Sequence, residues 1–132
     1  MKLRSLYLTV LLLCVLARTA AAETLLIVGD SLSAAYGIPV ETGWVALLQQ
    51  QLAAQHPGWN IVNASISGDT TANARARMPQ TVSTYQPDIV VLELGGNDGL
   101  RGLSLEAMRD NLAAMIELAQ TNDAGILLVG VD

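Results

Sequence analysis

Three glycine-rich corners of the sequence carry groups that could act together on an acyl group. Gly29-Asp30-Ser31 offers a hydroxyl, Gly68 offers backbone that a ligand can approach without a Cβ in the way, and Asn97 offers a side-chain amide. A nucleophilic hydroxyl with backbone and amide donors is the set of groups that stabilises the tetrahedral oxyanion of acyl transfer. Turn formation alone could explain each corner separately, but it does not explain why their chemistry is complementary.

Each of these corners follows an apolar run that is typical of a strand buried in a parallel sheet. Amphipathic patterns between the runs indicate helices, so strands and helices alternate along the chain. This order predicts an α/β fold with a parallel sheet, in which right-handed crossovers bring the carboxyl ends of all strands to one edge. Ser31, Gly68 and Asn97 are therefore expected to meet at that edge. The expected elements, in chain order, are residues 24–28, 43–55, 60–64, 71–85, 88–94, 104–120 and 125–131.

Two of the expected helices have an apolar face that should pack on the sheet. In the helix at 43–55 the face consists of Trp44, Leu47, Leu48 and Leu52. In the helix at 104–120, which Ser104 can cap, it consists of Leu105, Met108, Leu112, Met115, Ile116 and Ala119.

The first 22 residues are predicted to be a secretory signal peptide that is removed from the mature protein. A basic start at 1–4 precedes an apolar stretch at 6–17 and small residues at 20–22. An uncleaved membrane anchor is disfavoured, because a spanning helix needs about 20 apolar residues and Arg18 interrupts this run. We therefore expect one domain at 23–132, secreted or periplasmic, without a stable membrane anchor.

The charge that remains after cleavage disfavours nucleic-acid partners. Removing Lys2, Arg4 and Arg18 leaves four of the seven basic residues against all twelve acidic ones, a formal charge of −8. Such a surface repels phosphate backbones, and the sequence contains neither dinucleotide-binding nor P-loop glycine motif. The one cysteine, Cys14, is removed with the signal peptide, so the mature domain is expected to form no disulfide.

At its three corners the sequence resembles the SGNH-hydrolase family, whose members are also called GDSL esterases. The three family blocks occur in order, each after an expected strand, and the resemblance extends from Thr24 to about Val131. Longer runs resemble the exported bacterial branch of thioesterases, lysophospholipases and arylesterases. The blocks correspond to residues 29–33, 65–70 and 95–98, and the longer runs to residues 63–70 and 93–102.

The resemblance implies a flavodoxin-like three-layer α/β/α fold that hydrolyses carboxylic esters or thioesters. Ser31 would be the nucleophile, and its own backbone N–H, that of Gly68 and the side chain of Asn97 would form the oxyanion hole. Asp30 is expected to support the nucleophile corner by hydrogen bonds to nearby backbone. The expected partner is a small-molecule ester or thioester. Neither a metal nor another cofactor is implied, because this chemistry needs only donors, a nucleophile and a base.

The sequence departs from the family pattern at the catalytic base. The family's aspartate and histidine lie in a fourth block, Asp-x-x-His, near the C-terminus, and this chain has no such motif. Its one histidine, His56, follows the first helix and is expected at the edge opposite Ser31, whereas a nucleophile and its base must be about 2.6–3.2 Å apart. Asp69 and Asp98 are expected at the correct edge, but exposed carboxylates are weak bases, and each is expected to fix its own turn.

Two interpretations of this departure stay open. In the first, the chain is the N-terminal part of a longer esterase or thioesterase, truncated before the last strand, the last helix and the base, and is poorly active alone. In the second, it is a non-enzymatic acyl- or glycan-binding module that has lost its base. A metal hydrolase using Asp30, Asp69 and Asp98 is disfavoured, because no histidine or cysteine ligand is expected at that edge. Arg101 is expected to satisfy loop carbonyls rather than a substrate.

Overall fold

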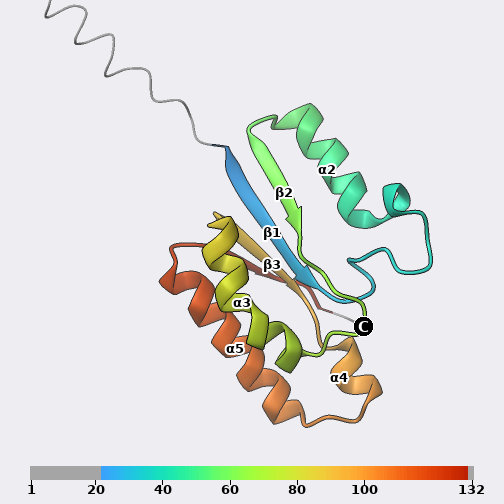
Figure 1. Ribbon diagram of the computed structural model, residues 1–132, viewed down its shortest axis with the longest axis vertical. Helices are drawn as coiled ribbons and strands as arrows, with labels where there is room; N and C mark the ends of the chain where they lie inside the picture. The colour runs from blue at the N-terminus through green and yellow to red at the C-terminus, as the bar shows by residue number, and fades with distance from the viewer. Residues whose placement is uncertain (1–21, 131–132) are drawn as a thin grey trace, which may run out of the picture.

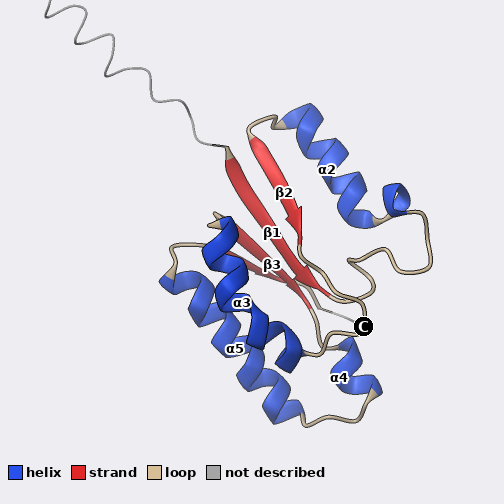
Figure 2. Ribbon diagram, in the orientation of Figure 1, coloured by secondary structure: helices blue, strands red, loops and turns tan. Residues whose placement is uncertain are grey.

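The computed structural model describes residues 22–130, which form a parallel sheet with helices on both faces (Figures 1 and 2). The predicted signal peptide at 1–22 lies outside the described residues except for Ala22, as does Val131 of the predicted final strand. That strand was predicted too long, because the described strand ends at Leu128. The described elements are β1 (Glu23–Gly29), η1 (Val40–Thr42), α2 (Trp44–Gln55), β2 (Trp59–Asn63), α3 (Thr71–Tyr85), β3 (Ile89–Glu93), α4 (Gly96–Leu100), α5 (Leu105–Thr121) and β4 (Gly125–Leu128).

The strand order is β2-β1-β3-β4, and every neighbouring pair is parallel. β1 lies between β2 and β3, with Ile27 opposite Asn63 and Gly29 opposite Glu93. Because the strands run in the same direction, the loops that follow β1, β2 and β3 leave the sheet at one edge. The structure thus confirms the predicted α/β fold.

The larger core lies between the sheet and the helix pair α3 and α5, which cover the same face (Figure 1). Alternate strand residues point to this face, because successive side chains of a strand lie on opposite sides of the sheet. The best-buried large side chains of this core, each at most 2% exposed, are Leu26, Val28, Met78, Val82, Val90, Leu92 and Met115. α2 packs on the opposite face, so the described residues form three layers (Figure 2).

The predicted packing face of α2 is right only in part: Leu48 and Leu52 are partly buried, but the assignment of Trp44 and Leu47 to this face is wrong. Trp44 is 36% exposed and Leu47 is 54% exposed, whereas Val45 is 8% exposed and packs with Ile27 and Val91 of the sheet. Apolar residues occur on two sides of this helix, each at helical spacing, so the pattern alone did not decide which side meets the sheet.

The face of α5 is confirmed at its C-terminal end, where Met115 and Ala119 are at most 1% exposed. Leu105, the first residue of the helix, is 72% exposed, so its assignment to the packing face is wrong. The predicted cap is confirmed, because Ser104 Oγ accepts a hydrogen bond from the Ala107 N–H at 3.2 Å. The Gly-rich corner after β3 was expected as a turn but forms the short helix α4.

No helix among the described residues is both long enough and apolar enough to cross a membrane.

We expect Met78→Ala to lower the free energy of unfolding by about 2–5 kcal/mol, because the side chain is fully buried between α3 and the sheet and its removal leaves a cavity. Gln80→Ala on the exposed side of the same helix is the control, with a change within about 0.5 kcal/mol. Urea unfolding of the purified protein measures both, and equal effects would contradict the assigned core.

Candidate active site

The structure brings the three glycine-rich corners together through the side chain of Asn97 in α4. Its Nδ2 donates to the main-chain oxygen of Asp69 at 2.9 Å and to Oδ2 of Asp30 at 3.3 Å. Asp30 immediately precedes Ser31, and Asp69 immediately follows Gly68. One amide group therefore connects the loops after β1, β2 and β3, as expected from the predicted parallel sheet.

Ser31 lies on a tight turn that begins as β1 ends. The N–H of Ala34 donates to the Asp30 carbonyl and that of Tyr36 to the Ser31 carbonyl, both at 3.0 Å. Oδ1 of Asp30 accepts from the Leu32 N–H at 3.0 Å, and Asp30 is only 3% exposed. Asp30 thus makes the expected hydrogen bond to nearby backbone, and its supporting role at this corner stays a prediction.

An open cleft of about 380 Å³ lies beside this turn. Two exposed leucines line it, Leu32 from the turn and Leu100 from the end of α4. Ser31 and Asn97 therefore line the same cleft as two apolar side chains. Its lining residues are Asp30, Ser31, Leu32, Gly96, Asn97 and Leu100.

Gly68 adopts a backbone conformation that favours glycine. Its φ of +85° lies in the left-handed region, where a side chain introduces strain. Nη2 of Arg101 donates to the Gly68 carbonyl at 2.9 Å and so links this corner to the segment that follows α4. The prediction that Arg101 satisfies a loop carbonyl is confirmed.

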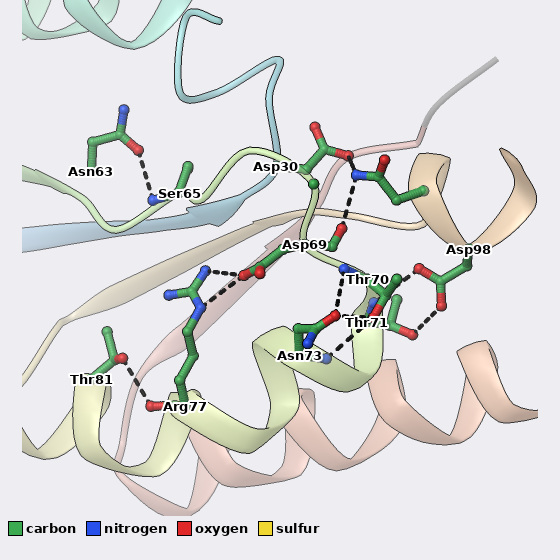
Figure 3. A network of polar contacts seen from close by, with 12 residues as sticks. Asp30, Asn63, Ser65, Asp69, Thr70, Thr71, Asn73, Arg77, Thr81 and Asp98 are labelled. Carbon is green, nitrogen blue, oxygen red and sulfur yellow. Dashed lines mark hydrogen bonds and ion pairs between the residues drawn. The ribbon is translucent and has the colours of Figure 1, made fainter. Parts of the chain in front are cut away.

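The predicted roles of Asp69 and Asp98 within their own turns are wrong. The Asp69 carboxylate forms an ion pair with Arg77 of α3 at 2.8 Å. The Asp98 carboxylate, 3% exposed, accepts from the N–H and the hydroxyl of Thr71 at 2.9 and 2.6 Å (Figure 3). Both side chains reach another element because their loops pack against the start of α3.

The hydrogen bonds and the ion pair of these aspartates give no support to the alternative of a metal site. Asp30, Asp69 and Asp98 point to separate partners, and the described part of the chain contains no group of three histidine, cysteine, aspartate or glutamate side chains that could hold a metal ion.

His56 lies far from Ser31, as predicted. It caps the C-terminal end of α2 and lines a small pocket with residues from the starts of β1, β2 and β3, including Trp59 and Ile89. Ser31 follows the other end of β1, a seven-residue strand that spans roughly 20 Å at about 3.3 Å per residue. His56 therefore cannot accept the proton of Ser31 in this fold.

Sequence reasoning missed a buried polar pair beneath the turn that carries Ser31. Oγ of Ser33 donates to Oε2 of Glu93 at 2.7 Å, and these residues are 2% and 4% exposed. Nδ2 of Asn63 donates to the Ser33 carbonyl at 2.8 Å. The only signal in the sequence was Glu93, a charged residue at the end of an otherwise apolar strand. That position alone did not indicate Ser33 as its partner.

The environment of Glu93 changes its acidity. Burial raises the pKa of the Glu93 carboxyl above its ordinary value of 4.5, and the nearby Asp30 carboxylate adds to the increase. The hydrogen bond from Ser33 acts in the opposite direction. Ionised Glu93 is thus more costly in the folded protein than in the unfolded chain.

This shift predicts how stability depends on pH. The folded protein holds the Glu93 proton more tightly than the unfolded chain does. The contribution of Glu93 to the free energy of unfolding is therefore fully present below the pKa of the unfolded chain, and it is lost as pH rises through the raised pKa of the folded protein. Glu93→Gln should therefore gain stability relative to the unmodified protein as pH rises from about 4 to neutrality. Urea unfolding across this range measures the difference, and a difference that does not change with pH would contradict the prediction.

The family model of the GDSL-like lipase/acylhydrolase family matches residues 27–132. Esterase TesA of Pseudomonas aeruginosa is 50% identical over 92% of this chain and 60% of its own length. An arylesterase of Vibrio mimicus is 43% identical over 92% of this chain and 61% of its own. Thioesterase 1/protease 1/lysophospholipase L1 of Escherichia coli K12 is 42% identical over 86% of this chain and 53% of its own. The chain thus spans between about half and three fifths of the length of these relatives.

Solved structures agree with the sequence relatives. A crystal structure of TesA superposes with a TM-score of 0.81 at 50% identity, over 83% of this chain and 61% of that one. A catalytic mutant of an acetylxylan esterase from Geobacillus stearothermophilus, in which a histidine is replaced by alanine, gives a TM-score of 0.72 at 28% identity, over 82% and 59% of the two chains. Since the family model covers most of the sequence and the parallel sheet gathers the three polar corners at one edge, the chain belongs to the GDSL-like lipase/acylhydrolase family.

Proposed function

We propose that the whole protein is a serine hydrolase of carboxylic esters or thioesters, with Ser31 as its nucleophile. The observation that carries this proposal is the Asn97 amide, which lies between the residue before Ser31 and the residue after Gly68. A substrate carbonyl in the adjoining cleft would have a hydroxyl and several N–H donors within reach. This is the arrangement that acyl transfer requires.

In this proposal the Ser31 hydroxyl attacks the carbonyl carbon while the oxygen gains negative charge. The backbone N–H groups of Ser31 and Gly68 and the amide of Asn97 would stabilise that charge. An amide has two N–H donors, and both are engaged in the structure. The longer contact, 3.3 Å to Asp30, is the one that a developing oxyanion would replace.

The proton acceptor would come from a part of the protein that this sequence does not contain. His56 is at the opposite edge of the sheet, and the relatives are longer than this chain. The acetylxylan esterase structure, whose described catalytic mutation removes a histidine, supports a histidine as that group. Residues 23–132 alone would then be poorly active, with Asp30 supporting the nucleophile turn.

The cleft supports an apolar acyl group as part of the substrate. Leu32 and Leu100, 61% and 88% exposed, would cover an acyl chain and exclude water from it. Aryl esters, acyl thioesters and lysophospholipids are the proposed substrate classes, in line with the names of the relatives. The basic, apolar and small-residue pattern of residues 1–22 supports export to the periplasm or medium.

A second candidate is a non-enzymatic acyl-binding module. It is favoured by one observation, that no histidine among residues 22–130 lies near Ser31. Such a module would bind fatty acyl ligands without turnover.

The decisive test is Ser31→Ala in the intact exported protein. We expect kcat for a p-nitrophenyl acyl ester to fall by at least about 10³-fold, because no other group forms the acyl-enzyme. Ser83→Ala, an exposed serine on α3, is the control and should leave kcat unchanged. Hydrolysis by the intact protein that survives Ser31→Ala would reject the proposed nucleophile, and acyl binding without any turnover would favour the module.

Asn97→Ala should lower kcat of the intact protein by about 10²–10³-fold with a much smaller change in KM, because the amide acts chiefly on the charge of the transition state. Asn60→Ala, at an exposed position of β2, is the matched control. Kinetics are measured well below the melting temperature of each variant, since Asn97 also holds loops together. A loss confined to KM would argue against an oxyanion role.

A further inference from the structure

Glu93 is placed where a charged side chain is costly. It is the last residue of β3 and is 4% exposed, and its Oε2 accepts a 2.7 Å hydrogen bond from the Ser33 hydroxyl. The backbone N–H groups of Asp30 and Ser33 also favour its charged form. Its Oε1 is buried and has no hydrogen-bond partner among the described residues. A buried, half-satisfied carboxylate lowers stability, so packing alone does not account for glutamate here.

The partner of Glu93 belongs to the nucleophile turn. Ser33 is two residues beyond Ser31, and it is held from both neighbours of β1: by Glu93 at the end of β3 through its hydroxyl, and by Asn63 at the end of β2 through its carbonyl. The turn is therefore anchored to all three strands whose loops form the candidate site.

The fit beneath the turn is close. Gly29 ends β1 directly opposite Glu93, and a Cβ at Gly29 would lie 2.6 Å from Oγ of Ser33 and 3.0 Å from Oε2 of Glu93. The Ser33–Glu93 pair thus occupies the space of a side chain at the strand end. Small shifts of this pair would be passed to the backbone on which Ser31 sits.

The turn also holds a strained residue. Ala35 has a φ of +57°, a conformation unfavourable for a residue with a Cβ, and it is 7% exposed. A strained backbone conformation persists only where surrounding contacts hold it in place. The hydrogen bonds of Ser33 with Glu93 and Asn63 tie this turn to the neighbouring strands and so help to hold that conformation.

We propose that Glu93 is a positioning residue for the nucleophile: by holding Ser33, it fixes the turn that presents Ser31 to the cleft. This inference rests on the proposed function, because it takes Ser31 as the nucleophile. Glutamate can hold the turn because its side chain is long enough to accept the hydrogen bond from Ser33. A glutamine side chain has the same length and also offers an oxygen acceptor. Alanine has neither. Asp30, also buried, is the charged side chain that faces Glu93 from the nucleophile turn.

The kinetic test compares Glu93→Ala and Glu93→Gln in the intact protein. We expect Glu93→Ala to lower kcat at least tenfold, and up to about 10²-fold, with KM changed less than about threefold, because a misplaced nucleophile loses alignment rather than substrate contacts. Glu93→Gln should retain most of kcat. Val82→Ala, a buried substitution in α3, is the control for general destabilisation and should lower the melting temperature without lowering kcat. Full kcat in Glu93→Ala, or equal losses in all three variants, would overturn the proposal.

A second readout does not depend on activity. Hydrogen exchange of the Ala34 and Tyr36 amides, which donate within the turn, should become faster in Glu93→Ala, while amides in the middle of α5 keep their rates. Exchange that is unchanged in the turn, or faster everywhere, would show that Glu93 does not hold it. If Ser31→Ala leaves hydrolysis intact, the proposed function fails, and the exchange measurement still decides whether Glu93 fixes the turn.

Discussion

The parallel register of β1, β2 and β3 is the constraint on which the candidate site depends. Gly29 lies opposite Glu93, so β1 and β3 end at the same level, and β2 ends at the same edge of the sheet with Asn63 opposite Ile27. Their loops leave side by side because the crossovers through α2 and α3 return the chain in the same direction. A shift of one residue in either pairing would turn Glu93 or Asn63 to the other face, and Ser33 would lose that anchor.

Acidic groups surround a place where negative charge would develop, and the structure compensates them one by one. The Asp30 carboxylate accepts from the Leu32 N–H and lies near the Asn97 amide, Asp69 pairs with Arg77, and Asp98 caps the start of α3 through Thr71. Each partner takes up charge that would otherwise oppose an oxyanion. These bonds also tie the loops together, so in the proposed reaction the N–H donors would be in place before a substrate binds, which is the basis of electrostatic preorganisation.

The strands and the main helices could be predicted from the sequence because the burial of each element shows in the spacing of its own apolar residues. α3 was predicted with its observed bounds, and β1, α2 and α5 to within one residue at each end. The face of α2 was predicted only in part, because its apolar residues extend to a second, exposed side that includes Trp44 and Leu47. The helix α4 was missed because its glycines disfavour a helix that the tertiary bonds of Asp98 help to hold. Ser31, Gly68 and Asn97 could be grouped because their corners each follow a strand. Ser33 and Glu93 could not, because they are 60 residues apart and no local pattern marks such a pair.

The separation between Ser33 and Glu93 has a consequence for how the protein is made. The ribosome synthesises the turn that carries Ser31 and Ser33 early, but the anchors of Ser33 follow 30 residues later at Asn63 and 60 residues later at Glu93. β1 cannot take its central position until β3 has emerged, because it pairs with β3 along one side. A nascent chain therefore carries Ser31 for some time on a turn that is not yet anchored, and the turn reaches its described geometry only after β1 has paired with both β2 and β3.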